Sequence, residues 1–296
     1  MANLKEVRIR IASVNTTQQI TKAMKLVSAS KLKRAQDRIL QMRPYSEKLN
    51  EMLSNIMSGM EGGSSLSFNK QREVKKVLIV LITSDKGLCG GFNSNLIKTA
   101  RKAITEDYAT QKKNKGVTFL CVGRKGYDYF KKDKDLNFIT DHVGLTARLS
   151  FENSQQVSEF LMQSFIEEKY DVIELVYSKF VNAAVQKYQF ERFLPVAASA
   201  QNPAVKTKAD YIFEPEKEKL LEELVPKILN TQLFKALCDN LASEHGARMV
   251  AMDSATNNAN ELIRSLKIVY NRERQSTITK ELLEIVAGAA ALEEKG

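Results

Sequence analysis

The residues best suited to chemistry lie together in one glycine-rich turn. This turn runs from Ser84 to Asn93 and combines a thiol, Cys89, with three glycines, Gly87, Gly90 and Gly91. Backbone N–H groups in such a turn can bind a phosphate, and a cysteine thiolate can act as a nucleophile. In a doubly wound fold, a nucleotide binds at this position, where the first strand ends.

The spacing of these residues favours a structural turn over either activity. The turn matches neither G-x-G-x-x-G nor G-x-x-x-x-G-K-[ST], and no acidic residue follows at a convincing ribose-binding position. No motif connects Cys89 with either histidine, His142 or His245. We therefore interpret the segment as a tight turn that uses glycine for positive φ, with a buried thiol. We expect no catalytic residue and no cofactor.

Cysteine usage and hydropathy limit the class of protein further. The three cysteines, Cys89, Cys121 and Cys238, lack metal-ligand spacing, so we expect no metal site. Their odd number indicates free thiols in a reducing compartment. The chain has neither an apolar run of 18 residues nor a signal sequence, which predicts a soluble protein that is not exported.

Strand and helix patterns alternate over residues 74–200, around the glycine-rich turn. Apolar, β-branched runs predict buried strands at 77–82, 117–122 and 172–177, with further strands at 137–143 and 188–194. Amphipathic patterns predict helices at 94–109 and 154–168, and a short helical segment at 127–132. This alternation predicts a layered α/β domain.

Long helices are predicted at both ends of the chain, over residues 1–58 and 217–292. Apolar residues recur there every three or four positions, which is the seam of a coiled coil. The seam residues are Leu4, Val7, Ile11, Val14, Ala255, Ala259, Leu262, Leu266 and Val269. Pro44 supports the alternative of several short helices on a globule. The last helix is predicted to begin either at Pro226 or near Glu216.

The basic charge of the chain is concentrated in the first long helix. The net charge is +10, and residues 1–48 hold eleven Lys and Arg against three Asp and Glu. A basic helix can bind nucleic acid, an anionic membrane surface or an acidic protein. Tyr45 is the only aromatic residue before Phe68, so stacking on bases is not supported. We expect an acidic protein partner and no nucleic acid.

The C-terminal segment 274–291 resembles the signature of the γ subunit of F-type ATP synthase. It contains Ile278-Thr279-x-Glu281, a further acid three residues on at Glu284, and then Gly288-Ala289. The segments 19–27, 83–93 and 243–259 are similar to the family's N-terminal helix, central-domain turn and C-terminal helix. The resemblance runs essentially from end to end.

The resemblance implies a rotor without bond chemistry of its own. In this family the terminal helices form a long antiparallel coiled coil, beside a central Rossmann-like α/β domain. The coiled coil stands inside a hexamer of α and β subunits, and its foot contacts the c ring and the ε subunit. Ion flow turns the c ring and the shaft, and the β subunits then change conformation in sequence. A catalytic site in the α/β domain and a basic coiled-coil scaffold for nucleic acid remain the alternatives.

Family positions also imply contact residues. Those expected to contact a β-subunit loop are Arg274, Gln275 and Thr279. Those expected near acidic β loops are Met24, Lys25, Lys31 and Lys33. Those expected at the c-ring foot are Tyr211 and Glu214. Those expected to form an apolar bearing tip are Ile285, Val286, Gly288 and Ala289.

The type of member is indicated by two further observations. Members of the chloroplast type carry a cysteine-bearing regulatory insert, and no such insert lies between Val185 and Tyr211. The first residues join the helical pattern directly, unlike a transit peptide. The chain therefore resembles a bacterial member, which implies a peripheral membrane protein on the cytoplasmic face of the inner membrane.

Overall fold

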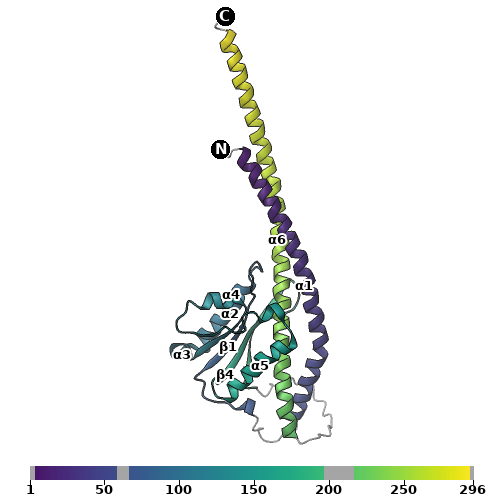
Figure 1. The fold of residues 1–296 in the computed structure, drawn as a ribbon, viewed down its shortest axis with the longest axis vertical. Helices are drawn as coiled ribbons and strands as arrows, with labels where there is room; N and C mark the ends of the chain where they lie inside the picture. The colour runs from purple at the N-terminus through teal and green to yellow at the C-terminus, as the bar shows by residue number, and fades with distance from the viewer. Residues whose placement is uncertain (1–3, 59–66, 197–216, 294–296) are drawn as a thin grey trace. The chain divides into compact units, whose positions relative to one another are not determined.

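The computed structural model describes residues 4–58, 67–196 and 217–293 (Figure 1). The predicted c-ring contacts Tyr211 and Glu214 lie outside these described residues. The chain divides into two compact units, one made of residues 1–27 and 249–296 and the other of residues 28–248. Both long helices contribute to both units.

Each predicted terminal helix is continuous. α1 runs from Leu4 to Ser58 over 55 residues and passes through Pro44 without ending. α6 runs from Lys217 to Glu293 over 77 residues, with Pro226 inside it. The last helix therefore begins close to Glu216, the second of its two predicted starting points. The alternative of several short helices at each end was wrong.

In the smaller unit, α1 and α6 pack in antiparallel directions. Three side-chain contacts show this, because the α6 number falls as the α1 number rises. They join Gln18 to Asn260, Thr21 to Thr256 and Lys25 to Asp253. The apolar residues buried between these helices are Val7, Met252, Ala259, Ile263 and Leu266. The antiparallel coiled coil is thus confirmed.

The buried stripe of α6 differs in part from the predicted seam. Leu262 and Val269 are 39% and 41% exposed, whereas Ile263 is buried. Beyond Met252, the buried positions on α6 are Ala259, Ile263 and Leu266, spaced by four and three residues. This spacing leaves Leu262 beside the seam.

The larger unit contains a five-stranded sheet. Its strands are β1 (Val77–Ile82), β2 (Val117–Val122), β3 (Asn137–Ile139), β4 (Val172–Phe180) and β5 (Gln186–Leu194). The strand order is β3-β2-β1-β4-β5. The first four strands are parallel, and β5 pairs with β4 in the antiparallel direction. All six residues of β1 and of β2 are buried, as expected for strands covered on both faces.

Helices cover both faces of this sheet. One face packs against α2 (Phe92–Glu106) and α4 (Arg124–Phe130). The other packs against α5 (Phe151–Ile166) and the part of α6 around Leu229, Leu233 and Leu237. The remaining short helices are η1 (Ser67–Asn69), α3 (Ala109–Lys113) and η2 (Leu145–Arg148).

This arrangement confirms a Rossmann-like α/β domain. The helices after β1 and β2 lie on one face, whereas α5, before β4, lies on the other (Figure 1). The chain thus changes faces between β1 and β4, and ligands in open α/β sheets bind at the carboxyl ends of strands at such a point. The glycine-rich turn follows β1 directly.

Candidate functional site

The glycine-rich turn is closed by contacts among its own side chains. The amide of Asn93 accepts hydrogen bonds from the backbone N–H and the hydroxyl of Ser84, and its nitrogen lies 3.2 Å from the sulfur of Cys89. Leu88 and Gly90 have positive φ angles of 61° and 58°. Cys89 is 2% exposed. The predicted tight turn with a buried thiol is therefore present.

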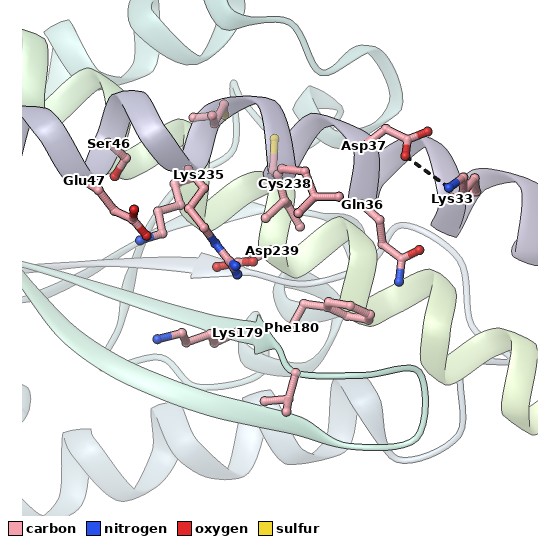
Figure 2. Close-up of a pocket in the computed structure, with 15 residues that line it drawn as sticks. Lys33, Gln36, Asp37, Ser46, Glu47, Lys179, Phe180, Lys235, Cys238 and Asp239 are labelled. Atoms are coloured by element: carbon pink, nitrogen blue, oxygen red, sulfur yellow. Dashed lines mark ion pairs between the residues drawn. The ribbon is translucent and has the colours of Figure 1, made fainter.

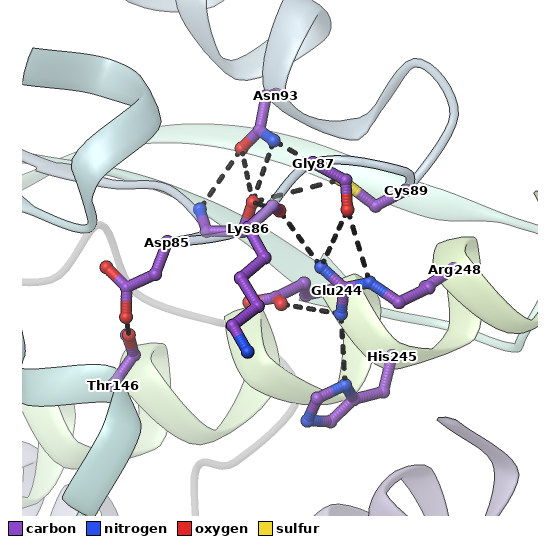
Figure 3. A network of polar contacts seen from close by, with 10 residues as sticks. Asp85, Lys86, Gly87, Cys89, Asn93, Thr146, Glu244, His245 and Arg248 are labelled. Atoms are coloured by element: carbon purple, nitrogen blue, oxygen red, sulfur yellow. Dashed lines mark hydrogen bonds and ion pairs between the residues drawn. The ribbon is translucent and has the colours of Figure 1, made fainter. Parts of the chain in front are cut away.

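The guanidinium of Arg248, on α6, binds the backbone carbonyls of this turn (Figure 3). Its Nη2 donates to the carbonyl oxygens of Lys86 and Gly87, over 3.0 Å and 3.3 Å. Its Nη1 lies 2.7 Å from Oε1 of Glu244, one helical turn earlier. A phosphate cradle needs N–H groups directed at the ligand, whereas here carbonyl oxygens face a cation. The polarity of this site is opposite to that of a nucleotide site.

Beside this turn, a carboxylate of the chain itself lies at the start of α4, where an external anion would otherwise bind. Oδ1 of Asp85 accepts a hydrogen bond from the backbone N–H of Arg124, the first residue of α4, and Oδ2 accepts one from the hydroxyl of Thr146. Gly123, just before α4, has φ of 99°, and a Cβ there would lie 2.1 Å from the carbonyl oxygen of Thr83. This close approach of β1 and β2 requires glycine.

The pKa values of two residues beside Arg248 reflect its charge and their burial. Burial raises the pKa of Glu244, while the guanidinium of Arg248 opposes that rise. Burial, together with the charges of Arg248 and Lys31, lowers the pKa of His245 to about 4. Burial and Arg248 therefore act in opposite directions on the pKa of Glu244, and His245 is neutral at pH 7.

We call Glu244, Arg248 and the carbonyls of Lys86 and Gly87 the α6 latch. The sequence analysis did not single out this group. A signal was present, since Glu244 and Arg248 are an i,i+4 pair of opposite charge on one helix face. Their carbonyl partners have no signature in the side-chain sequence. Close packing accompanies the latch, because a Cβ at Gly246 would lie 3.2 Å from the Cα of Ala183.

The four residues predicted near acidic β loops differ in their surroundings. Met24 and Lys25 belong to the smaller unit, whereas Lys31 and Lys33 belong to the larger. Lys25 forms an ion pair with Asp253, and Lys33 lies 3.5 Å from Asp37. Met24 is half-buried and Lys31 is exposed. Two of the three predicted lysines therefore already have a carboxylate partner within the chain.

The predicted contacts near the end of α6 are exposed. Arg274, Gln275 and Thr279 are all exposed, and the hydroxyl of Thr279 donates to the carbonyl of Gln275 within the helix. Ile285 and Val286 are 68% and 64% exposed. A Cβ at Gly288 would meet no atom within 4 Å. The structure thus leaves these side chains available to a partner.

The ion pair between Lys25 and Asp253 provides a test of the coiled-coil register. Both side chains are more than one-third exposed, so the pair is expected to contribute at most about 1 kcal/mol. Lys25→Asp places like charges together and is expected to lower the free energy of unfolding by about that amount. Adding Asp253→Lys is expected to restore it, as measured by urea denaturation. Failure of the double variant to recover would contradict this register.

In residues 4–58, 67–196 and 217–293, no helix is both long and apolar enough to cross a membrane. Among the same residues, no group of three His, Cys, Asp or Glu side chains is arranged to hold a metal ion.

Comparisons with known proteins agree with the resemblance seen in the sequence. A family model described as ATP synthase matches residues 3–292. The ATP synthase gamma chains of Cytophaga hutchinsonii and Christiangramia forsetii are 50% and 51% identical, each over 99% of both chains. A chain of the rotor of Euglena gracilis mitochondrial ATP synthase matches in structure with a TM-score of 0.64 and 20% identity, over 93% of this chain and 98% of that one. The chain belongs to the ATP synthase γ chain family.

Proposed function

We propose that the chain is the central rotor shaft of a bacterial F-type ATP synthase. In this role it passes rotation of the c ring, driven by ion flow, to the catalytic β subunits. The observation that supports the proposal most strongly is the exposed final part of α6. From Ile278 to Val286 its large apolar side chains are 48% to 68% exposed, in a chain of this family.

An exposed apolar surface of this kind indicates a protein partner. Soluble proteins rarely leave contiguous apolar patches uncovered unless another molecule binds there. The large side chains that form this surface are Ile278, Leu282, Leu283, Ile285 and Val286. No charged residue occurs between Ile285 and Leu292. An apolar tip can turn within an apolar sleeve without exchanging ion pairs at each step.

We assign the contact residues by their surroundings and their family positions. Gln275 and Thr279, one helical turn apart, would form hydrogen bonds with a β-subunit loop, and Arg274 would add a charged contact. Met24, Lys25, Lys31 and Lys33 would pass acidic β loops. Tyr211 and Glu214 would contact the c ring. Because Lys25 is paired with Asp253, it would have to share or exchange that partner.

The mechanism requires no bond chemistry from this chain. Residues 1–58 and 217–292 would form the shaft, and residues 74–200 the domain at its foot. An asymmetric shaft contacts each β subunit differently, so it favours a different β conformation at each angle. A partner shifts a conformational equilibrium only through such differential contacts. The partners would be the α and β subunits, the ε subunit and the c ring, at the cytoplasmic face of the inner membrane.

Reconstitution with the cognate α and β subunits tests this proposal. We expect one copy of the chain to co-elute with three α and three β subunits, and the complex to hydrolyse ATP. A variant truncated after Tyr270 keeps the paired part of the coiled coil and serves as the comparison. Failure of the full chain to assemble would overturn the proposal, as would equally stable assembly and equal ATP hydrolysis by the truncated variant.

A further inference from the structure

A pocket of about 520 Å³ lies within the larger unit, away from the α6 latch. Its walls are the middle of α1, the end of β4 and one turn of α6 (Figure 2). Three elements far apart in the sequence thus converge on one hollow. Its volume falls within the roughly 300–1,000 Å³ range of small-molecule sites.

Each of these three elements contributes a cation to the pocket. Arg43 comes from α1, Lys179 from β4 and Lys235 from α6. None of the three forms an ion pair with any residue that the structure describes. By contrast, the fourth lining cation, Lys33, lies near Asp37. Against the carboxylates of Glu47 and Asp239 in the same lining, these three cations leave an excess of positive charge, which attracts anions.

Part of the remaining wall of the pocket is apolar. Its apolar lining residues are Ile39, Leu40, Met42, Phe180 and Val181. Leu40 and Val181 are 61% and 48% exposed, although they are large apolar side chains. A ligand with an apolar or aromatic body would cover this surface, which an inorganic anion would not.

The acids of the pocket set its dependence on pH. Asp239 is 5% exposed. Burial raises the pKa of Asp239 to about 6, although Lys235, Lys179 and Arg43 oppose that rise. Glu47 also lines the pocket. Below pH 6 Asp239 loses its negative charge, and the pocket becomes more positive.

We propose that this pocket binds an organic phosphate. The phosphate group would lie among Arg43, Lys179 and Lys235, and the body of the ligand would pack against Phe180 and its apolar neighbours. A phosphate carries more charge than a carboxylate, and the planar guanidinium of Arg43 can bind two of its oxygens. Because the site needs no other subunit, a negative result would leave the proposed rotor function untouched.

Calorimetric titration of the full chain tests the site, with phenyl phosphate as the probe. Inorganic phosphate supplies the charge alone and phenol supplies the ring alone. We expect phenyl phosphate to bind at one site per chain, more tightly than inorganic phosphate, with no binding of phenol. Arg43→Gln and Lys235→Gln are each expected to weaken binding roughly tenfold, the effect of losing one charged hydrogen bond. Lys267→Gln, at an exposed position on the same helix, is the matched control.

The charge of Asp239 provides a second test at a single pH. At pH 7.5, where phenyl phosphate keeps its full charge, Asp239→Asn is expected to bind it more tightly than the wild type, because a negative charge beside the three cations is removed. Circular dichroism of each variant checks that the fold is kept. Absence of saturable binding would overturn the proposal, as would equal weakening by Lys267→Gln. Tight binding of an acidic peptide that phenyl phosphate cannot displace would also overturn it, in favour of a protein partner.

Discussion

Arg248→Ala is expected to lower the free energy of unfolding by about 3–5 kcal/mol, because it removes one partner of a buried ion pair. The side chains of Arg248 and Glu244 are only 10% and 9% exposed. The substitution leaves the carboxylate of Glu244 buried without its cation. It also leaves the carbonyls of Lys86 and Gly87 without the guanidinium that donates to them.

The loss of free energy of unfolding in Arg248→Ala is expected to depend on pH. Burial already raises the pKa of Glu244, and without Arg248 that pKa rises further. A carboxyl whose pKa is higher in the folded than in the unfolded state contributes to the free energy of unfolding at low pH. That contribution is present below the unfolded pKa and is lost as pH rises through the folded pKa. His245 acts in the same direction, because removing Arg248 relieves one cause of its lowered pKa. Lys31 and Asp85 also face this group, and neither is changed.

Urea denaturation at pH 5 and pH 7.5 measures both effects. The free energy of unfolding of Arg248→Ala is expected to fall short of the wild-type value by less at pH 5 than at pH 7.5. Arg248→Ala/Glu244→Gln is expected to recover part of the loss at pH 7.5, since no charge is then buried alone. Arg264→Ala, at an exposed position of α6, is the control and is expected to change stability little. A deficit that is equal at both pH values would show that Glu244 is not the residue left unpaired.

The latch also bears on the proposed rotor. It fixes α6 to the turn that follows β1, within a single compact unit. In the assembled enzyme, a loosened latch is expected to reduce ion pumping per ATP hydrolysed more than it reduces hydrolysis itself. The ratio of the two rates, measured in membrane vesicles, distinguishes this role from simple loss of assembly, which would lower both together.

The strands whose bounds were predicted best are those that are buried on both faces of the sheet. The bounds of β1 and β2 match the predicted 77–82 and 117–122, because strands buried on both faces appear as continuous apolar runs. β3 ends at Ile139 instead of residue 143, since an edge strand has only one neighbour to extend its pairing. α5 begins three residues before its prediction, where Ser150 caps the helix by accepting from the N–H of Asn153.

The candidate sites show what a single sequence can and cannot supply. Family positions indicated Gln275 and Thr279, and both are exposed. The latch was missed because Arg248 binds backbone carbonyls 161 and 162 residues away, and any residue type provides a carbonyl. The pairing of Lys25 with Asp253 was missed for a related reason. It depends on the register of two helices, and the charge pattern of one helix does not determine that register.

Gln275→Ala/Thr279→Ala is expected to slow ATP hydrolysis by the reconstituted complex between about fivefold and a hundredfold. The reason is the loss of the two proposed hydrogen bonds to a β loop, each worth about 0.5–1.5 kcal/mol. Both side chains are exposed, and the hydroxyl of Thr279 donates to the carbonyl of Gln275 in the same helix. The substitution is therefore expected to leave the stability of the isolated chain unchanged.

The matched control is Ser276→Ala/Lys280→Ala, which has the same spacing one position further along the helix. Both of these residues are exposed, and they lie about 100° around the helix from the proposed contact face. If Gln275 and Thr279 contact a β loop, the control complex should hydrolyse ATP at nearly the wild-type rate. Equal slowing by both pairs would place the contact elsewhere on α6. Slowing by the first pair alone, with normal assembly, would locate the contact on that face, because helix propensity and exposure are closely matched between the two pairs.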